Sequence, residues 1–367
     1  MQIVAVGQAF PEHHYDQDTL VAAFEEHWGG RLFNPDRLTR LHRNVRVGGR
    51  HLALPIESYP ALRSFTEAND AYIRVGLDVG ERAVRDALAI AGLAAEDVDH
   101  LFFVSVTGVA TPSLDAGLAN RLDFRPDLKR TPIFGLGCVA GAAGVARAAD
   151  YLRAFPDQIA VLLSVELCSL TLQRGDLSIP NLIASGLFGD GAAAVVLLGA
   201  DRDATRGRDT DGPLVPDGPG RPAGPRVIAT RSVFYPDTEH LMGWKIGSDG
   251  FRVVLSADVP VVIGERIRRD VDAFLAGHGL CRDDIAVWVS HPGGPRILEA
   301  MEEALELPDE ALARTWRSLA EIGNLSSASV LMVLRETMRE SAPEPGAHGL
   351  LLAMGPGFCS ELVLLRW

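Results

Sequence analysis

The amino-acid sequence predicts an α/β fold made of two similar halves, and the main observation behind this prediction is an internal repeat. Residues 80–105 and residues 264–290 each read as an amphipathic helix, a Gly-Leu pair, an acidic turn and a short apolar strand. The composition agrees with a folded globular chain, since 47% of the 367 residues are hydrophobic and 23% are charged. A strand–helix–strand unit that occurs twice indicates duplicated βαβ halves.

The elements that follow each copy of the repeat also correspond to one another. In the first half we expect, in order, a strand at 132–135, a small-residue helix at 139–152, and strands at 158–165 and 192–198. In the second half we expect a helix at 325–340, and strands at 349–354 and 361–367. Because order and spacing agree over several elements, we expect two packed half-domains and not a longer series of repeats.

A boundary between the halves is visible in the composition. Residues 201–226 are rich in Gly, Pro, Asp and Arg and carry little apolar material, so they are predicted to form a loop without a catalytic role. We therefore place the first half at residues 1–200 and the second half at residues 227–367.

Charge and cysteine content exclude several classes of protein. The chain has 35 Lys and Arg against 48 Asp and Glu, and a net charge of −13 disfavours sequence-independent binding of nucleic acid. Its four widely spaced cysteines, with no C-x-x-C pair, predict free thiols and neither a disulfide framework nor a zinc site. The N-terminus lacks a signal-peptide pattern, and no apolar run reaches the roughly 18 residues of a membrane span. We expect a cytoplasmic protein that binds neither nucleic acid nor membranes.

Cys138 is the first candidate catalytic residue. It lies in the run GLGCVAG, where a predicted strand gives way to a helix. Small residues allow other groups to approach closely, and the free N–H groups of a helix N-terminus lower the pKa of a thiol and favour the reactive thiolate. A single cysteine is more often buried and inert, so Cys138 needs partners to be convincing. The glycines do not form a dinucleotide-binding loop, because Ala140 interrupts the G-x-G-x-x-G spacing.

His291 and Asn324 are the candidate partners. His291 ends an apolar strand in the run WVSHPGG, where a side chain can pair with a thiol and donate to a developing oxyanion. Asn324 precedes a predicted helix in the run GNLSSAS, and an asparagine there is commonly only a helix N-cap. Its place in the second half, however, corresponds to that of Cys138 in the first. If the halves pack about a pseudo-twofold axis, the three residues converge in one cleft as a Cys–His–Asn site.

Five motifs in the same order resemble one enzyme family, the type III polyketide synthases of the chalcone and stilbene synthase superfamily. The motifs are GLGCVAG at 135–141, LFGDGAAAVV at 187–196, VSHPGGPRIL at 289–298, GNLSSAS at 323–329 and MGPGF at 354–358. The runs at 105–116, 165–171 and 242–256 resemble the bacterial branch of that family. The resemblance covers nearly the whole chain. It implies a thiolase-like fold, in which the two halves pack as five layers, αβαβα.

The resemblance also implies an acyltransferase reaction. Cys138 would take an acyl starter from its CoA thioester, and malonyl-CoA would then enter the same cavity. His291 and Asn324 would stabilise the enolate that forms as carbon dioxide leaves. The enolate would attack the Cys-bound thioester, and the cycle would repeat until the chain cyclises. This chemistry needs no metal and no cofactor beyond the acyl-CoA and malonyl-CoA substrates, and the family implies a homodimer.

Further residues are assigned to the substrate cavity by the same resemblance. Phe188 matches a phenylalanine that stands between the CoA tunnel and the cavity. The second such position falls on Val253, and Phe251 is expected to replace it from the same side of a strand. The remaining implied cavity positions are Val106, Thr111, Cys168, Leu170, Thr171, Trp244 and Ser326, with Thr111 inserted across the dimer interface. The basic residues implied to bind CoA phosphates are Arg43, Arg46 and Arg50.

The sequence indicates the product less directly than it indicates the class of reaction. Val106 occupies the position of a cysteine found in tetrahydroxynaphthalene-forming relatives, and the region 242–251 resembles enzymes that take fatty acyl starters. We therefore predict an alkylpyrone-type or alkylresorcinol-type product. A malonyl-primed synthase of a small aromatic, of the tetrahydroxynaphthalene or dihydroxyphenylacetyl type, remains the first alternative. A single condensation of the β-ketoacyl-carrier-protein synthase III type, a cysteine hydrolase and an inactive thiolase fold are the others.

Overall fold

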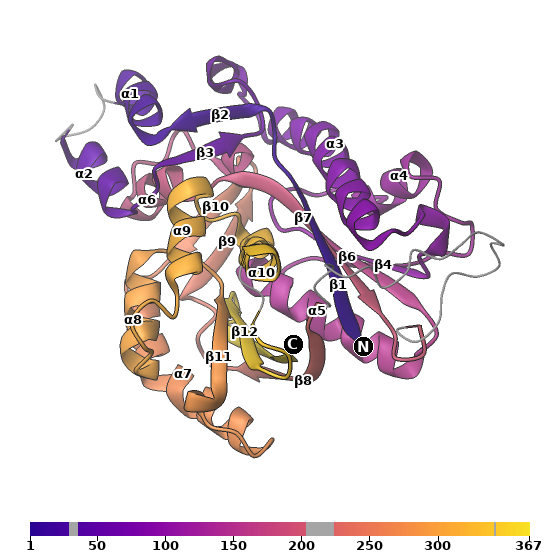
Figure 1. Cartoon of the computed structure of the whole chain (residues 1–367). Helices are drawn as coiled ribbons and strands as arrows, with labels where there is room; N and C mark the ends of the chain where they lie inside the picture. Colours follow the sequence, from indigo (N-terminus) through magenta and orange to yellow (C-terminus); the bar gives the residue numbers. More distant parts are fainter. Residues whose placement is uncertain (29–35, 203–223, 341–342) are drawn as a thin grey trace.

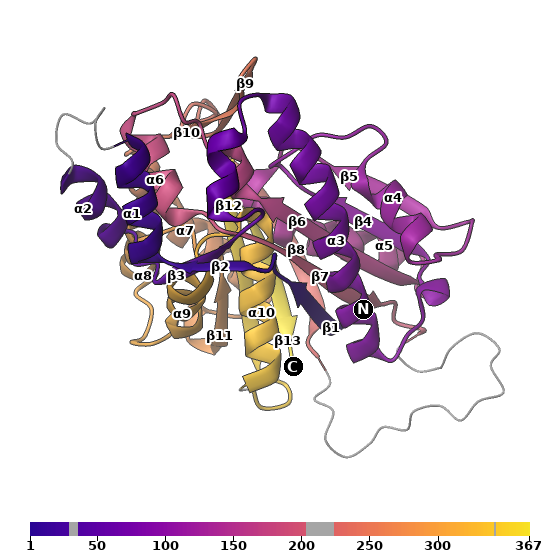
Figure 2. The same cartoon turned by 90° about the horizontal axis from the view of Figure 1, so that it is seen from above.

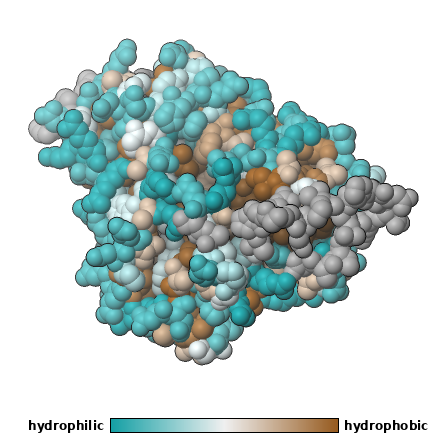
Figure 3. Space-filling view, in the orientation of Figure 1, coloured by the Kyte–Doolittle hydropathy of each residue, from teal (hydrophilic) through white to brown (hydrophobic). Residues whose placement is uncertain are grey.

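The structure, a computed structural model, describes residues 1–28, 36–202, 224–340 and 343–367. Most of the loop predicted at 201–226 lies outside these described residues. Within them, nine strands form one mixed sheet, and helices cover it (Figure 1). The face seen in Figure 3 is mostly hydrophilic, as a net charge of −13 leads one to expect. No helix among the described residues is long and apolar enough to cross a membrane.

The strands are β1 Gln2–Ala9, β2 His13–Asp16, β3 Gly49–Leu52, β4 His100–Val104, β5 Lys129–Ile133, β6 Ile159–Leu167, β7 Asp190–Leu198, β8 Arg226–Phe234, β9 Met242–Gly247, β10 Gly250–Leu255, β11 Ile285–Ser290, β12 His348–Gly355 and β13 Cys359–Arg366. The α-helices are α1 Gln17–Trp28, α2 Asp36–Asn44, α3 Phe65–Ala91, α4 Leu114–Arg121, α5 Ala140–Ala154, α6 Ile179–Leu187, α7 Val259–Ala276, α8 Pro295–Leu305, α9 Ala313–Ile322 and α10 Ser329–Glu340. The short 3₁₀ turns are η2 Ile56–Ala61, η3 Ala95–Asp97, η4 Gly137–Val139, η5 Cys168–Thr171, η6 Arg282–Asp284 and η7 Ser326–Ala328.

The order of strands repeats within the sheet. The first half runs β5-β4-β6-β7-β1, and the second half runs β11-β12-β13-β8. In each half a parallel pair, β4–β6 or β11–β12, is followed by antiparallel neighbours. The two sets meet at a single pair, Gln2 with Arg226. The strand–helix–strand repeat expected from the sequence is therefore present in the topology.

The layers are defined by the helices that cover each face of the two strand sets. In β6, Leu162 points to a central core that contains α5 and α10, whereas Leu163 points to an outer core under α3. In the second half, Val363 faces the same central core and Leu364 faces an outer core that contains α7 and α8. Strands covered on both faces are largely apolar, which is why β6 shows no regular alternation in sequence. The five layers are thus α3 and α4, the first strand set, α5 and α10, the second set, and α7 and α8, and the predicted thiolase-like αβαβα fold is confirmed.

The predicted helix limits need two corrections. Helix α3 begins at Phe65, well before residue 80, because Ser64 and Glu67 form a capping box at its start. The expected helix at 325–340 begins instead with η7, where Ser326 has a φ of +48°, and only then continues as α10. Asn324 is therefore not the N-cap of α10.

A group of elements outside the sheet gathers at one end of the molecule. The two-stranded antiparallel sheet of β2 and β3, together with α1, α2 and α6, lies there in both views, with the β9–β10 hairpin beside α6 (Figures 1 and 2). The β9–β10 hairpin is a separate two-stranded sheet. Of these elements, α1, β3, α6 and the β9–β10 hairpin contribute to the wall of the larger cavity described next.

Candidate active site

The three predicted catalytic residues line one cavity of about 60 Å³. Cys138 lies in η4 directly before α5, His291 follows β11, and Asn324 precedes η7. The thiol therefore comes from the first half of the chain, and the imidazole and the amide come from the second. His291 and Asn324 are 4% and 1% exposed. The convergence expected from the repeat is found.

Two glycines allow the turns that carry these residues to come close together. A Cβ on Gly141 would lie 2.2 Å from the carbonyl oxygen of Ser327, so only glycine lets α5 approach η7 this closely. Gly137 has a φ of +57°, and a Cβ there would lie 2.7 Å from Pro356. The result places Cys138 Sγ 3.6 Å from Ser326 Oγ. The glycines around Cys138 thus allow the two halves of the chain to approach closely beside the thiol.

The Asn324 amide is held in a fixed orientation. Its Oδ1 accepts the backbone N–H of Ser326 at 2.7 Å, and its Nδ2 donates to the carbonyl of Gly293 at 3.4 Å. The backbone N–H of Asn324 donates to Leu187 O at 2.9 Å, and its carbonyl accepts from Gly189 N at 3.0 Å. These contacts place the amide beside the residue that follows the His291-Pro292 turn.

Burial shifts the pKa values of the thiol and the imidazole in opposite directions. Burial raises the pKa of Cys138 to about 12, although its hydrogen bond with Ser326 acts against the rise. Burial lowers the pKa of His291 to about 3, and neither ring nitrogen has a hydrogen-bond partner within the described part of the chain. Both groups are therefore uncharged in this structure. An imidazole of this kind can accept the thiol proton as a thioester is attacked, and its N–H can donate to an oxyanion.

Glu166 is a buried residue near the site that our sequence analysis did not single out. It lies in β6 and accepts from the Val106 N–H at 3.1 Å, from Thr107 Oγ1 at 2.9 Å and from Ser327 Oγ. Burial raises its pKa to about 7. Because Ser327 belongs to the second half, this carboxyl group links the two halves behind Cys138. The signal in the sequence was an acidic residue within the largely apolar run IAVLLSVEL.

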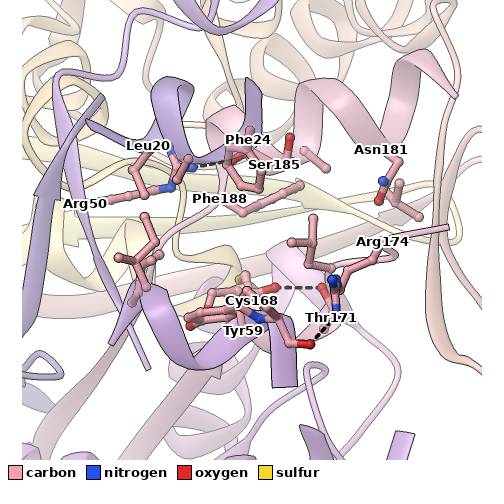
Figure 4. Close-up of a pocket in the computed structure, with 18 of the residues that line it drawn as sticks. Leu20, Phe24, Arg50, Tyr59, Cys168, Thr171, Arg174, Asn181, Ser185 and Phe188 are labelled. Carbon is pink, nitrogen blue, oxygen red and sulfur yellow. Dashed lines mark hydrogen bonds between the residues drawn. The ribbon is translucent and has the colours of Figure 1, made fainter. Parts of the chain in front are cut away.

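Most of the other predicted cavity residues line one or both of two neighbouring cavities. A second cavity of about 580 Å³ lies beside the first, and Figure 4 shows Phe188 and Ser185 on one side of it and Tyr59 and Cys168 on the other. The residues that line both cavities are Cys168, Phe188, Trp244 and Val253. Val106 and Ser326 line only the small cavity, which we call the reaction cavity, and Thr171 lines only the larger one.

Three of the predicted cavity residues, Phe251, Leu170 and Thr111, lie outside both cavities. Phe251 does not line either cavity and does not replace the phenylalanine expected at Val253. Its ring lies behind Trp244, 6.0 Å from the indole, and 5.5 Å from the ring of Phe65. The two positions share one face of β10, but the cavity reaches only as far as Val253 along that strand. Leu170 packs in the core under α3 and borders a separate surface groove.

The three arginines predicted to bind CoA differ in exposure, and Thr111 lies outside both cavities. Arg50 is 1% exposed and donates to Gln17 Oε1 at 2.6 Å, to Gly186 O at 2.7 Å and to Ser185 O. Its N–H groups therefore hold α6 in place, and its side chain also lines the 580 Å³ cavity, so its role in CoA binding stays a prediction. Arg43 is exposed, and Arg46 is exposed and pairs with Glu299 at 2.8 Å. Thr111 is exposed on the loop after β4 and lines neither cavity.

The described residues contain no group of three or more His, Cys, Asp or Glu side chains placed to hold a metal ion. All four cysteines are free thiols. That the reaction needs no metal and no cofactor stays a prediction from the sequence.

Similarity to known proteins covers the whole chain. Residues 1–202 match the family model described as chalcone and stilbene synthases, N-terminal domain, and residues 226–367 match the corresponding C-terminal domain. The chain is 54% identical to 1,3,6,8-tetrahydroxynaphthalene synthase from Streptomyces peucetius subsp. caesius, over 100% of this chain and 93% of that protein. It is 36% identical to a putative chalcone synthase from Bacillus subtilis, over 100% and 98% of the two chains.

One solved structure extends this similarity to the fold. The crystal structure of 1,3,6,8-tetrahydroxynaphthalene synthase from Streptomyces coelicolor A3(2), described as a bacterial type III polyketide synthase, matches with a TM-score of 0.90. The sequence identity is 31%, and the match covers 100% of this chain and 99% of that one.

Proposed function

This chain belongs to the chalcone and stilbene synthase family and is a type III polyketide synthase, and from that premise we propose that Cys138, His291 and Asn324 carry out its catalysis. The observation that carries the proposal is the convergence of these three side chains, from both halves of the fold, on one cavity. Their chemistry matches the two tasks of the reaction, which are to hold an acyl group and to stabilise an enolate.

The first step loads the starter on Cys138. The Cys138 sulfur attacks the carbonyl carbon of an acyl-CoA, the carbon–sulfur bond to CoA breaks, and CoA leaves as the thiol. The thiol of Cys138 is uncharged at neutral pH because burial raises its pKa to about 12. His291, whose pKa burial lowers to about 3, is uncharged too, and in this proposal it takes the thiol proton during the attack and passes it to the sulfur of the leaving CoA.

The second step extends the chain by two carbons. Malonyl-CoA loses carbon dioxide, and the electron pair of the broken bond forms an enolate on the acetyl-CoA fragment. The N–H of His291 and the Nδ2 of Asn324 donate to its oxygen. The enolate carbon then attacks the thioester on Cys138, a carbon–carbon bond forms, and the sulfur of Cys138 leaves and is free to be loaded again.

For the product, we propose a small aromatic built only from malonyl units, of the tetrahydroxynaphthalene type. The support is the similarity to a 1,3,6,8-tetrahydroxynaphthalene synthase that is 54% identical over the whole of this chain. The alkylpyrone or alkylresorcinol product expected from the sequence is the second candidate. The observation in its favour is the 580 Å³ cavity beside the thiol, with Leu20, Phe24 and Leu52 in its wall.

A panel of substrates tests this proposal. The purified protein is incubated with ¹³C-labelled malonyl-CoA, either alone or with unlabelled hexanoyl-CoA or palmitoyl-CoA, and the products are read by mass spectrometry. We expect malonyl-CoA alone to give a fully labelled aromatic product, and Cys138→Ala to abolish it. Products that form only with an added fatty acyl-CoA would favour the second candidate. If wild type releases no extended product from any mixture, the proposed catalytic roles are wrong.

A homodimer is part of the proposed function. The carboxyl ends of β4 and of the edge strand β5 present Thr111 together with Val109 and Phe134, which are 40% and 52% exposed. Exposed apolar side chains next to an unpaired strand edge favour association with a second copy. We expect sedimentation to show a dimer, and Phe134→Asp to shift it to a monomer. The equally exposed but distant Val261→Asp is the control, and a monomeric wild type would contradict the proposal.

A further inference from the structure

Three hydrogen-bonded side chains connect the wall of the 580 Å³ cavity to a buried carboxyl group. Tyr59 in η2 and Ser169 in η5 both line this cavity, and Figure 4 shows Tyr59 beside Cys168, whose side chain also lines the reaction cavity. Tyr59 Oη lies 2.5 Å from Ser169 Oγ, and Ser169 Oγ in turn donates to Asp190 Oδ2. Asp190 begins β7 and is fully buried.

The direction of these hydrogen bonds follows from the charge and contacts of Asp190. Its Oδ1 accepts the backbone N–H of Ser169 at 2.8 Å, and its Oδ2 accepts that of Ala53 at 2.6 Å. A carboxylate only accepts, so the Ser169 hydroxyl donates to it and accepts in turn from the Tyr59 hydroxyl. Tyr59 Oη also accepts the N–H of Leu54 at 3.4 Å, and no other described residue donates to it. One lone pair of Tyr59 Oη is therefore left for a ligand.

Asp190 is suited to accept a proton near neutral pH. Burial raises its pKa from 3.8 to about 6, although its hydrogen bonds and the charge of Arg50 act against the rise. A general base is most effective when its pKa lies near the working pH. Burial also raises the pKa of Tyr59 far above its ordinary value, so the phenol gives up its proton only as it receives another.

Ring closure of a polyketide through carbon requires a base of this kind. A carbon between two carbonyl groups loses a proton before it attacks a third carbonyl group. Cys138 and His291 line the reaction cavity, whose volume of about 60 Å³ leaves no room for a folded polyketide of several malonyl units. Among the described residues that line the larger cavity, the carboxyl groups are those of Glu26 and Glu57, which are exposed to water. The hydroxyl groups that lead to Asp190 connect the larger cavity to a base that solvent does not reach.

We propose that Tyr59, Ser169 and Asp190 form a proton relay that acts as the general base for carbon–carbon ring closure in the 580 Å³ cavity. Tyr59 Oη takes the proton of the attacking carbon, the Tyr59 proton moves to Ser169 Oγ, and the Ser169 proton moves to Asp190 Oδ2. The electron pair left on carbon forms the new bond to a carbonyl carbon. The oxygen of that carbonyl group becomes an alkoxide and receives the proton back through the relay. The proposal rests on the malonyl-derived aromatic product proposed above.

The ratio of two kinds of product measures the relay. A polyketide that does not close through carbon closes through an enol oxygen as a lactone, and the steps before ring closure affect both products equally. The protein is incubated with ¹³C-labelled malonyl-CoA, and the products are separated by chromatography and identified by mass spectrometry. We expect Ser169→Ala and Tyr59→Phe each to lower the ratio of aromatic product to lactone at least about tenfold, since general base catalysis contributes about 10²–10⁴-fold.

Two further variants distinguish the relay from a structural role. Ser169→Thr keeps a hydroxyl group at the same position and should restore the ratio to within about threefold of wild type. Tyr15→Phe removes a hydroxyl group that accepts the Ile56 N–H at 3.0 Å, at the start of the same turn η2 that carries Tyr59. Tyr15 lines neither cavity, so this variant should leave the ratio within about twofold of wild type.

The dependence of this ratio on pH tests the carboxyl group itself. Asp190 must be ionised to accept a proton, so the wild-type ratio should fall as the pH is lowered through about 6. The other titratable groups that face Asp190 are Arg50 of β3, Tyr59 of η2 and Cys168 of η5. The pKa of Arg50 is about 10, and those of Tyr59 and Cys168 are raised by burial, so none of the three titrates near pH 6. In Ser169→Ala the ratio should be low and independent of pH.

The outcomes separate this inference from the function on which it rests. Wild-type protein that releases no extended product overturns both. Wild type that makes only lactones overturns the aromatic product and the relay, but not the condensation steps. If wild type makes the aromatic product, the relay alone is overturned by an unchanged ratio in Ser169→Ala and Tyr59→Phe, or by a wild-type ratio that does not depend on pH.

Discussion

At the scale of single residues, the site combines two uncharged groups with one fixed amide. Burial lowers the pKa of His291 to about 3, so its imidazole is neutral at every pH at which the protein is expected to work. A neutral imidazole has one N–H to donate and one nitrogen to accept. Asn324 supplies a second donor whose direction is set by Ser326 and Gly293.

Loss of the His291 donor is predicted to affect decarboxylation most strongly. We expect His291→Ala to reduce the rate of malonyl-CoA decarboxylation by about 10²–10³-fold, the usual effect of removing one oxyanion donor. The measurement is carbon dioxide release from carboxyl-labelled malonyl-CoA. His278→Ala, in the exposed turn after α7, serves as the control. A His291→Ala rate within a few-fold of wild type would remove His291 from the mechanism.

The residues that meet at the site were predictable where a motif and the repeat agreed, as for Cys138, His291 and Asn324. It was not predictable where the outcome depended on packing. The sequence shows that Phe251 and Val253 lie on one face of a strand, but not how far along that face the cavity extends. Nor does it show that the Arg50 side chain turns inward to bind the carbonyls of Ser185 and Gly186. Such outcomes are decided by contacts between distant segments of the chain.

At the scale of elements, the junction of η4 and α5 with η7 controls the geometry of the site. The turns meet because residue 141 has no side chain, and this contact sets the position of the thiol next to Ser326. The sequence predicted helices in both places, but it did not predict the 3₁₀ turns before them. A left-handed φ at Ser326 gives no clear signal in a run of serines.

A methyl group at this junction is predicted to destabilise the fold. The Cβ of Gly141→Ala would meet the Ser327 carbonyl, and overpacking of this kind costs about 1–3 kcal/mol. Gly264→Ala is the matched control in α7, because nothing lies within 4 Å of its Cβ. An alanine there should raise stability by about 1 kcal/mol through helix propensity. Urea unfolding measures both, and an equal response of the two variants would contradict the proposed contact.

At the scale of the whole molecule, the two halves share one core and one buried carboxyl group. Helices α5 and α10 contribute to a single central cluster, and Glu166 of the first half bonds Ser327 of the second. The repeat predicted two packed half-domains, and the family resemblance implied their five layers, but neither predicted the buried carboxyl group. The joining of the two strand sets through Gln2 and Arg226 was not predictable, because it depends on how the halves pack.

Glu166 is predicted to make stability depend on pH. Its pKa is raised from 4.5 to about 7 in the folded protein, so the folded state binds this proton more tightly than the unfolded state. The stability contributed by the protonated group is complete below pH 4.5 and is lost as the pH rises to about 7.

The Glu166→Gln variant isolates this effect, because its side chain stays neutral at every pH. Relative to wild type, we expect Glu166→Gln to gain stability between pH 4.5 and 7, by about 1.4 kcal/mol for each pKa unit of the shift. The measurement is the free energy of unfolding in urea at a series of pH values. A constant difference between the two proteins across that range would show that Glu166 does not titrate as described.

The division of the site between the halves also bears on how the protein is made. A ribosome synthesises Cys138 long before Asn324, and first domains tend to fold before later ones are complete. A nascent or truncated chain can therefore carry the nucleophile while it lacks both the imidazole and the amide. If the three residues act as proposed, acyl transfer becomes possible only when the last third of the chain has packed against the first half, so activity indicates a completely synthesised and folded chain.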